Sequence, residues 1–570
     1  MSIPALVFFA CALMAGQSAL AQGGMVIIPI GGDPNEGTNE PTQTENGYCG
    51  DPTVNLGEDV SYSYDPEANT LTISGTGAME SYEGTYQRPW NEYRNCITTI
   101  VIGSGVTSIG DNAFRECENL LSVTIPSSAT EIGDYALAYC ENLNSVTIQG
   151  ESQLTNIKEG AFSGCESLSS FTIPASVTTI GGYAFAYCTI LTGFEIPAGV
   201  TSIGPAAFSG CPEVSSITLA QGNANFLVDD GILFNNDGTR LICYPAGKSD
   251  ATYTVPARVR IIDEGAFSDN EYLTSVTFEN NSQLITIGIE AFVGDINLES
   301  ITIPDKVTGI GEYAFAACFN LVTVTFDDAS ALDSIGMAAF DMTPWYDNAD
   351  EVVIIGSILY KVKDSYTGPL NISNGIKVIG RSACMNCTDL TAVTIPESVT
   401  TIGEEAFAYC NDLTSVTFIG NSQLTTIDRY AFSYSGLTSI TIPASVTDID
   451  EAAFEGCSSL TTVTFDGESH LTKINDNLFN GCISLMEITI PSSVTSIGKY
   501  SFWDCELMTT VTFDGESQLN YIGSNAFLEC YALSAIEIPS GVTYIGDNAF
   551  CQCGLETVSF APNSHLTVID

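Results

Sequence analysis

Residues 168–188 read LSSFTIPASVTTIGGYAFAYC, and close copies of this stretch recur along most of the chain. Residues 390–410, LTAVTIPESVTTIGEEAFAYC, and residues 485–505, LMEITIPSSVTSIGKYSFWDC, are two of them. The pattern L-x-x-V-x-I-P-x-x-V-x-x-I-G-x-x-A-F-x-x-C repeats about every 23 or 25 residues, in about 18 units. Such repeats predict a solenoid, because no unit can bury its apolar face alone and stacking makes one long core.

Within a unit, the segment SVTI alternates apolar and polar residues, which is the period of a half-buried strand. The Pro that follows cannot donate a ladder hydrogen bond and ends the strand. A second apolar pair, Val494 and Ile497 in one unit, predicts another side of the coil. Gly498 then turns the chain, and Phe502 and Cys505 are predicted to point inward. Longer units replace the Pro turn by G-E-S-Q-L or a similar stretch.

Most of the 19 cysteines occupy the last position of the repeat. They are Cys117, Cys140, Cys165, Cys188, Cys211, Cys318, Cys387, Cys410, Cys457, Cys482, Cys505, Cys530 and Cys553. Equivalent positions of a solenoid stack into a column, and a free Cys behaves as a small buried hydrophobe. We therefore favour a ladder of buried thiols. Disulfides are the alternative in an exported protein, although pairing of neighbours would break the repeat symmetry.

Two other pairs of cysteines need separate interpretation. Cys384 and Cys387 form a CxxC pair, but Cys384 occupies the usual Phe position, so core packing is favoured over a zinc site. Cys49 and Cys96 flank the region before the repeats and are the candidates for a disulfide.

The charge is strongly acidic, with 68 Asp and Glu against 16 Lys and Arg and a net charge of −52. Nucleic-acid binding needs cationic side chains that displace counterions, and anionic membrane surfaces also attract cations. Neither partner is expected. The simplest consequence of the acidity is a soluble surface that resists aggregation.

The first residues, MSIPALVFFACALMAGQSALAQGG, combine an apolar run with a small-residue cleavage signal, and predict a signal peptide over residues 1–21. The segment departs from the usual pattern because no Lys or Arg precedes the apolar run. Residues 22–46 are rich in Gly, Pro, Asn and Thr and predict a flexible linker. We expect export and no membrane insertion after cleavage.

Residues 47–96 alternate apolar and polar residues between turn signals and predict a small N-terminal β cap. Repeats occupy residues 97–570, with longer excursions near 220–251 and 341–369. The last repeat lacks its A-F-x-x-C half. Our expectation is a truncated chain or a piece of a longer product.

These motifs together resemble the BspA-like leucine-rich repeat surface proteins, over about residues 47–570. Beyond the repeats, the match includes the lead-in LTISGTGAMESYEGTYQRPWNEYRNCITTIVI from residue 71 and the excursions that begin near residues 223 and 343. The resemblance implies a β-rich solenoid of the α/β-type leucine-rich repeat class, right-handed and with a parallel sheet. It also implies a secreted or cell-surface role, often adhesion, although a fold alone does not fix a function.

Catalytic machinery is not indicated. The two histidines, His470 and His565, occupy a variable position of the longer units, and no triad, P-loop or zinc-protease motif occurs. We expect no enzyme activity and no cofactor or metal. Calcium binding by Asp229 and Asp230, or by Asp327 and Asp328, is the remaining metal hypothesis, but neither pair belongs to an EF-hand pattern.

The outward position of the first strand is nearly always Thr, and this column is the candidate binding face. Its members are Thr124, Thr147, Thr172, Thr218, Thr277, Thr302, Thr325, Thr394, Thr417, Thr441, Thr464, Thr489 and Thr512, with Glu195 and Glu537 as interruptions. Thr also simply suits an exposed strand position. An ice-binding array is a weaker alternative, because the sheet should curve and the acidic residues interrupt the column.

The excursions supply candidate hot spots, because loops on a rigid scaffold often carry function and aromatic residues anchor interfaces. These candidates are Trp345, Tyr346, Phe226 and Tyr244, of which some are expected to pack the excursions onto the core. The sequence thus favours a secreted or cell-surface protein that binds extracellular proteins or cell surfaces and mediates adhesion. A surface-coat or spacer protein without a discrete ligand is the alternative.

Overall fold

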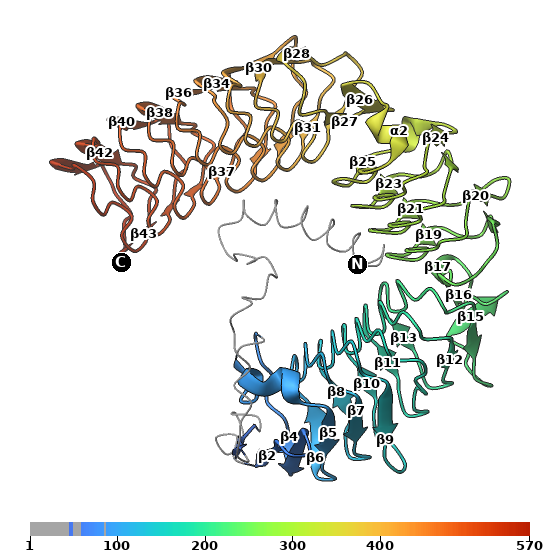
Figure 1. Ribbon diagram of the computed structural model, residues 1–570. Coiled ribbons are helices and arrows are strands. Elements are labelled where there is room, and N and C mark those ends of the chain that lie inside the picture. The colour runs from blue at the N-terminus through green and yellow to red at the C-terminus, as the bar shows by residue number, and fades with distance from the viewer. Residues whose placement is uncertain (1–44, 50–58, 85–86) are drawn as a thin grey trace. The chain divides into compact units, whose positions relative to one another are not determined.

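The computed structural model describes residues 45–49, 59–84 and 87–570. The expected signal peptide, and the linker apart from residues 45 and 46, lie outside the described residues. The chain divides into a first unit, residues 1–327 with 338–348, and a second unit, residues 328–337 with 349–570. Each unit is a stack of coils that contribute strands to parallel sheets (Figure 1). The predicted parallel-sheet solenoid is therefore confirmed.

In the first unit, the cap and the longer strands form one column. Its strands are β1 (Glu45–Tyr48), β2 (Val60–Asp65), β3 (Thr70–Gly75), β5 (Thr99–Ile102), β7 (Ser122–Ile125), β9 (Ser145–Ile148), β12 (Phe194–Ile196), β14 (Ile217–Leu219), β18 (Thr252–Val255), β20 (Ser275–Phe278), β22 (Ser300–Ile303) and β24 (Thr323–Phe326). A second column of shorter strands comprises β4 (Gly77–Ala78), β6 (Val106–Ile109), β8 (Glu131–Ile132), β10 (Asn156–Ile157), β11 (Thr179–Ile180), β13 (Ser202–Ile203), β17 (Arg240–Cys243), β19 (Ile261–Ile262), β21 (Thr286–Ile287) and β23 (Gly309–Ile310).

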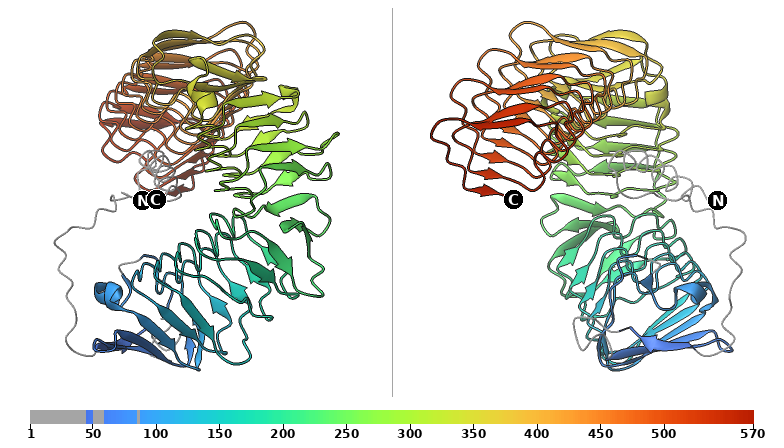
Figure 2. Two further views of the ribbon diagram at one scale, coloured as in Figure 1. Left: turned by 45° about the vertical axis from the view of Figure 1, so that its right-hand side comes forward. Right: turned by 90° about the vertical axis from the view of Figure 1, so that its left-hand side faces the viewer.

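The second unit repeats this arrangement, and Figure 2 shows its strands stacked along the array. The longer strands are β28 (Gly368–Asn371), β30 (Leu390–Ile395), β32 (Ser415–Phe418), β34 (Ser439–Ile442), β36 (Thr462–Phe465), β38 (Glu487–Ile490), β40 (Thr510–Phe513), β42 (Ala535–Ile538) and β44 (Thr557–Phe560). The shorter strands are β25 (Ser334–Ile335), β27 (Ile358–Val362), β29 (Val378–Ile379), β31 (Thr401–Ile402), β33 (Thr426–Ile427), β35 (Asp448–Ile449), β37 (Lys473–Ile474), β39 (Ser496–Ile497), β41 (Tyr521–Ile522), β43 (Tyr544–Ile545) and β45 (Val568–Ile569).

A small antiparallel cap begins the first unit. Strands β1 and β2 pair antiparallel, as do β2 and β3, and β3 then starts the parallel ladder with β5. A short 3-10 helix, Asn91–Cys96, follows the cap strands. Trp90, which is fully buried, stacks on Phe114 with ring centroids 5.5 Å apart and donates its indole N–H to the Ala113 carbonyl at 2.9 Å. The cap thus covers the apolar end of the first coil.

Each of the two excursions contains an antiparallel hairpin. In the first unit, β15 (Phe226–Asp229) pairs with β16 (Ile232–Asn235), which pairs with β17 before the parallel ladder resumes at β19. In the second unit, β26 (Val352–Ile355) pairs with β27. The first unit also contains the one-turn helix α2 (Pro344–Asp347), and the second contains a short 3-10 segment, Ala329–Ala331. No helix among the described residues has the length and apolar character that a membrane crossing requires.

The third side of each coil is a tight turn held by backbone bonds to the next coil. Tyr135 and Tyr139 have φ of 54° and 59°, in the left-handed region. Their N–H groups, and that of Leu137 between them, donate to carbonyls of the following coil at 2.7–2.9 Å. Gly160 and Gly164 occupy the same positions one coil later, where φ is again positive. The left-handed conformation at these positions directs alternate N–H groups along the solenoid axis, where they donate to the next coil.

Inside these turns the Phe side chains form continuous stacks. In the second unit the rings of Phe407, Phe432 and Phe454 lie 5.2 and 5.4 Å apart with planes inclined by 8° and 3°. In the first unit, Phe292 and Phe315 are related in the same way, at 4.9 Å. All five rings are buried. Each Phe thus packs against its equivalent in the next coil, as the repeat predicts.

The cysteine column is a ladder of buried thiols in the structure. Cys188 donates its Sγ–H to the carbonyl of Phe162 at 3.3 Å, and Cys482 donates to that of Phe454 at 3.2 Å. Burial raises the pKa of these thiols. Cys384 is fully buried at the Phe position, and its carbonyl accepts the next thiol of the column, so it is a core residue.

The expected disulfide between Cys49 and Cys96 is not formed. Cys49 is a buried free thiol whose backbone N–H and carbonyl tie the end of β1 to Val60 and Glu80. Cys96 is only half-buried, at the end of the 3-10 helix. The candidate pairing was therefore wrong, and Cys49 instead packs as a thiol in the core cluster of the first unit.

Candidate interaction face

The predicted threonines do stack across neighbouring strands. Thr124 lies opposite Thr147, Thr302 opposite Thr325, and Thr441 opposite Thr464 in the parallel registers. The pairs Thr394–Thr417 and Thr489–Thr512 are aligned in the same way. Eleven of the thirteen side chains are exposed, and Thr124 and Thr394 are half-buried. We call the outward residues of this column, with Thr254 added, the threonine face.

Hydroxyl groups bond to one another along this face. The Oγ1 atoms of Thr441 and Thr464 lie 2.9 Å apart, and those of Thr489 and Thr512 lie 2.8 Å apart. Thr254 in β18 bonds to Thr277 at 2.9 Å in the same manner. Thr254 is not among the threonines predicted from the sequence because its unit reads TYTVP rather than SVTIP. Neighbouring hydroxyls thus satisfy one another across the ladder while remaining accessible.

The face is not uniform. Residues 171–174 form no strand, and Thr172 is an exposed residue outside the ladder. Phe171 replaces the usual Val there, and its ring packs against those of Phe162 and Phe185 at 5.0 and 5.1 Å. Glu195 opposes Thr218 in the register, and Glu537 opposes a serine. The polar surface is therefore divided into segments.

Coil length alternates in the second unit, and this alternation shapes the face. Long coils of 24 or 25 residues span 413–436, 460–484 and 508–532, and short coils of 23 residues span 390–412, 437–459 and 485–507. Each long coil carries a loop in which a Ser side chain accepts a backbone N–H group. In one of them, Ser469 Oγ accepts the N–H of Leu471 at 3.3 Å. The short coils turn tightly at Pro, where Val494 N–H donates to the carbonyl of Pro491 at 3.0 Å.

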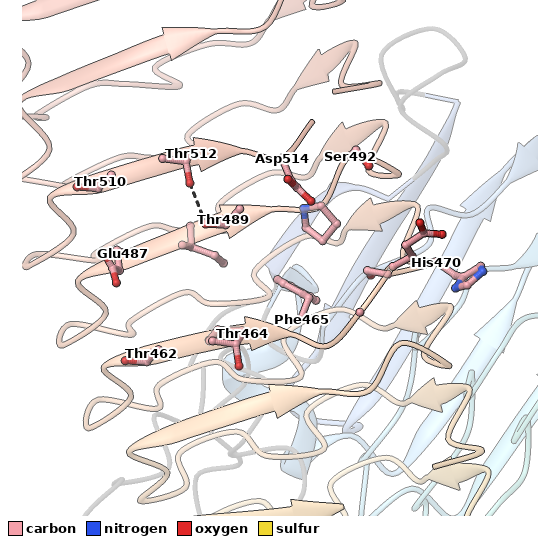
Figure 3. A pocket seen from close by; sticks show the side chains of 16 residues that line it. Thr462, Thr464, Phe465, His470, Glu487, Thr489, Ser492, Thr510, Thr512 and Asp514 are labelled. Atoms are coloured by element: carbon pink, nitrogen blue, oxygen red, sulfur yellow. Dashed lines mark hydrogen bonds between the residues drawn. The ribbon is translucent and has the colours of Figure 1, made fainter. Parts of the chain in front are cut away.

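Each of two short coils forms the floor of a hollow between long-coil loops. The Thr489 hollow, of about 600 Å³, is lined by residues that include Thr464, Phe465, His470, Thr489, Pro491 and Asp514 (Figure 3). The Thr441 hollow, of about 510 Å³, is lined by residues that include Phe418, Asn421, Thr441, Pro443, Ala444 and Asp466. The threonine face thus carries concave sites, which were not predicted from the sequence although the alternating loop lengths indicate them.

His470 lies on the loop between these hollows. Its Nδ1 is 3.1 Å from the carbonyl oxygen of Ala444, on the short coil that floors the Thr441 hollow, and the residue also lines the Thr489 hollow. A carbonyl only accepts, so Nδ1 carries a proton. His565 makes the equivalent contact with Ser540 at 3.0 Å. This contact positions the loop.

The aromatic residues of the excursions differ in how far their side chains are buried. Tyr244 is wrong as a binding candidate, because it is 1% exposed and its ring packs between those of Tyr253 and Phe267 at 5.1 and 5.0 Å. Trp345 in α2 is half-buried, and its ring packs on Phe340 at 4.8 Å, at the end of a Phe stack. Tyr346 and Phe226 are also half-buried. Phe226 also packs against the core cluster, and Tyr346 stays a candidate for an external contact.

Metal-ligating groups do not converge within the described ranges 45–49, 59–84 and 87–570, where no cluster of three or more His, Cys, Asp or Glu could hold an ion. Asp230 forms an ion pair with Lys248 at 2.9 Å, and Asp229 lies 3.8 Å from Arg258. These two carboxylates are therefore engaged by cations, one within the excursion and one just after it.

Two buried carboxyl groups replace the usual repeat residues in the first unit. Asp295 occupies a cysteine-column position, and Asp269 lies one residue before another such position, filled by Asn270. Burial, with nearby Glu290 and Glu271, raises the pKa of Asp269 to about 7. Burial also raises the pKa of Asp295, whose Oδ1 accepts the N–H of Asn270 at 2.9 Å. We assign no binding or catalytic role to these two carboxyl groups.

Several solved structures are similar to this chain. Similar solved structures include a leucine-rich repeat protein from Eubacterium ventriosum, 27% identical over 74% of this chain and 96% of that chain, with a TM-score of 0.46. Another is a leucine-rich repeat protein from Bacteroides ovatus, 22% identical over 90% and 98%, with a TM-score of 0.26. A leucine rich cell surface protein from Faecalibacterium prausnitzii is 23% identical over 90% and 97%, with a TM-score of 0.24.

No curated protein sequence matches the chain. The sequence model described as "BspA type Leucine rich repeat region (6 copies)" matches residues 91–223, 247–350, 377–469 and 465–570, which is well over half of the chain. The chain therefore belongs to the BspA-type leucine-rich repeat family.

Proposed function

We propose that this chain is a secreted or cell-surface protein that binds other extracellular proteins or cell surfaces through its threonine face, and that this binding mediates adhesion to host or neighbouring cells. Its repeats form an interaction scaffold without a catalytic role. The observation that carries the proposal is the threonine face, whose mostly exposed side chains lie in register on neighbouring strands within each unit. Solenoids commonly use such extended surfaces for binding. The apolar leader and the strongly acidic composition support an extracellular location.

The test measures saturable binding of the purified protein to a panel of extracellular-matrix proteins and to intact cells at physiological salt. Thr464→Arg places a bulky cation on the threonine face and is expected to weaken binding at least tenfold. Thr447→Arg is the matched control, because Thr447 is exposed but lies outside that face, before β35. Equal loss in both variants, or none in either, would remove the threonine face from the proposal.

Two further measurements test the excursion as a binding site and the alternative of a surface-coat or spacer role. Tyr346→Ala tests the excursion without removing the Trp345 ring that packs on Phe340. Absence of saturable binding to every matrix protein and cell, by a monodisperse protein, would support a surface-coat or spacer role instead.

A further inference from the structure

The Thr441 and Thr489 hollows are two copies of one site. Thr441 corresponds to Thr489, Pro443 to Pro491, and Asp466 to Asp514 in the aligned coils. Both Asp residues follow the Phe that ends a long-coil strand, and their N–H groups donate to Ile442 and Ile490 at 2.9 Å. The ladder therefore holds the two carboxylates in equivalent positions, two coils apart.

The walls of the hollows combine acidic and apolar groups. Asp514, Glu468 and Glu487 line the Thr489 hollow, and Asp466 lines the Thr441 hollow. Among the described residues that line either hollow, none is Lys or Arg. Figure 3 shows Phe465 and Asp514 on the two coils that flank the Thr489 strand. A cationic group with an aliphatic stem fits this combination, because the stem contacts Phe and Pro while the charge reaches the carboxylates.

The distance between the hollows limits the shape of the partner. Two strand intervals of a parallel sheet are about 9.6 Å. A polyproline II segment advances about 9.3 Å in three residues and returns the same face after each turn. Residues three apart in a β-strand point to opposite faces. A polyproline II segment that runs along the solenoid axis therefore presents every third side chain to successive hollows, and such segments already dock in grooves lined by aromatic residues.

We propose that the two hollows together bind an extended, polyproline II-like segment of a partner protein that carries Lys or Arg at every third residue. This inference rests on the proposed protein-binding function and names the partner chemistry of one part of the threonine face. Each cationic side chain enters one hollow, where Asp466 or Asp514 meets its charge. The Pro residues of the segment lie along the Phe and Pro side chains of the hollow walls.

The test uses the full chain and fluorescently labelled peptides built from Pro-Pro-Lys repeats. Control peptides have the same composition with Lys at irregular spacing, or Glu in place of Lys. We expect saturable binding of the regular peptide, at least tenfold tighter than of the irregular one, and weaker as salt is added. Equal binding of the regular and irregular Lys peptides would overturn the proposal, because charge alone would then explain it.

Variants locate the site. The double variant Asp466→Asn and Asp514→Asn is expected to lose at least tenfold in affinity for the regular peptide, with an unchanged unfolding midpoint since both side chains are exposed. Asp547→Asn, an exposed position on another side of the coil, is the control and should bind as the parent does. Unchanged binding by the double variant would overturn the assignment. If no peptide binds while matrix proteins do, the partner chemistry is wrong and the proposed function stands. If only peptides bind, adhesion is wrong and the site stands.

Discussion

The thiol of Cys505 donates a hydrogen bond to the backbone carbonyl of Phe479, one coil earlier, at 3.3 Å. The same carbonyl accepts the backbone N–H of Cys482 at 3.2 Å, so it has two donors inside the core. This relationship recurs along the array and explains why the repeat ends in Cys. The residue is small and apolar enough for the core, and it still supplies a donor to a carbonyl that water cannot reach.

Replacing one thiol of the column should therefore cost more than the lost volume. For Cys505→Ala we expect a destabilisation of about 1–2 kcal/mol, from the lost burial and the lost donor. Cys505→Ser keeps a donor and should differ from Cys505→Ala in the exchange rate of amides near Phe479. Because long repeat arrays depart from two-state unfolding, the measurement is amide hydrogen exchange in the coil together with the unfolding midpoint.

The control for this prediction is Cys551→Ala. Cys551 is exposed, one residue after the Phe position of its coil. Its substitution should change stability by no more than about 0.5 kcal/mol. An equal effect of both substitutions would show that burial and the hydrogen bond of Cys505 contribute nothing specific.

The reactivity of the thiols should also differ between the exposed Cys551 and the buried cysteines of the column. Burial raises the pKa of Cys117 to about 12 and that of Cys457 to about 11, so the reactive thiolate is scarce as well as inaccessible. Among the described cysteines, we expect Cys551 to be modified by maleimide within minutes in the native protein, while Cys117 and Cys457 react only after denaturation. Mass spectrometry of peptides from the labelled protein measures this order. Early labelling of the column cysteines would contradict the buried ladder.

The sequence predicted the regular part of the fold better than its exceptions. Thr441 and Thr464, like most of the predicted threonines, lie in register because a fixed period fixes their stacking, whereas Thr172 lies outside the ladder. Tyr244 was misassigned because the excursion was treated as a surface loop, whereas its third strand rejoins the core and buries the ring. The hollows escaped prediction because they arise from loops of different lengths on adjacent coils, which no single repeat contains. The thiol-to-carbonyl bonds of the cysteine column also depend on contacts between coils.

The Asp269 carboxyl should make the stability of the first unit depend on pH. Its pKa is about 7 in the folded chain and near the ordinary value of 3.8 in the unfolded chain, because folding buries it. The folded state therefore holds the proton more tightly, and its stability is highest below about pH 4 and falls as the pH rises toward 7. Asp269→Asn cannot ionise and tolerates the left-handed backbone, where φ is 59°. We expect this variant to be more stable than the parent at pH 8, with little difference at pH 4.

Thermal unfolding across pH 4–8 measures this difference. Asp305→Asn is the control, because Asp305 is exposed in the same unit. A parent and an Asp269→Asn protein with parallel stability curves over this range would show that the Asp269 carboxyl does not titrate in the folded chain.

The cap should protect the first coils from local unfolding. Trp90→Ala removes a buried ring that stacks on Phe114 and bonds to the Ala113 carbonyl, with an expected local loss of about 3–5 kcal/mol. The amides of Phe114 and Glu116, which donate to the next coil at 2.8 Å, should exchange much faster. Amides of the second unit, such as Phe479 N–H, should be unaffected, because coils contact only their neighbours. Trp503→Ala, at a half-buried tryptophan of the second unit, is the matched control and should leave the exchange of Phe114 unchanged. Uniform acceleration along the whole chain after Trp90→Ala would mean that the array unfolds as one cooperative body rather than coil by coil.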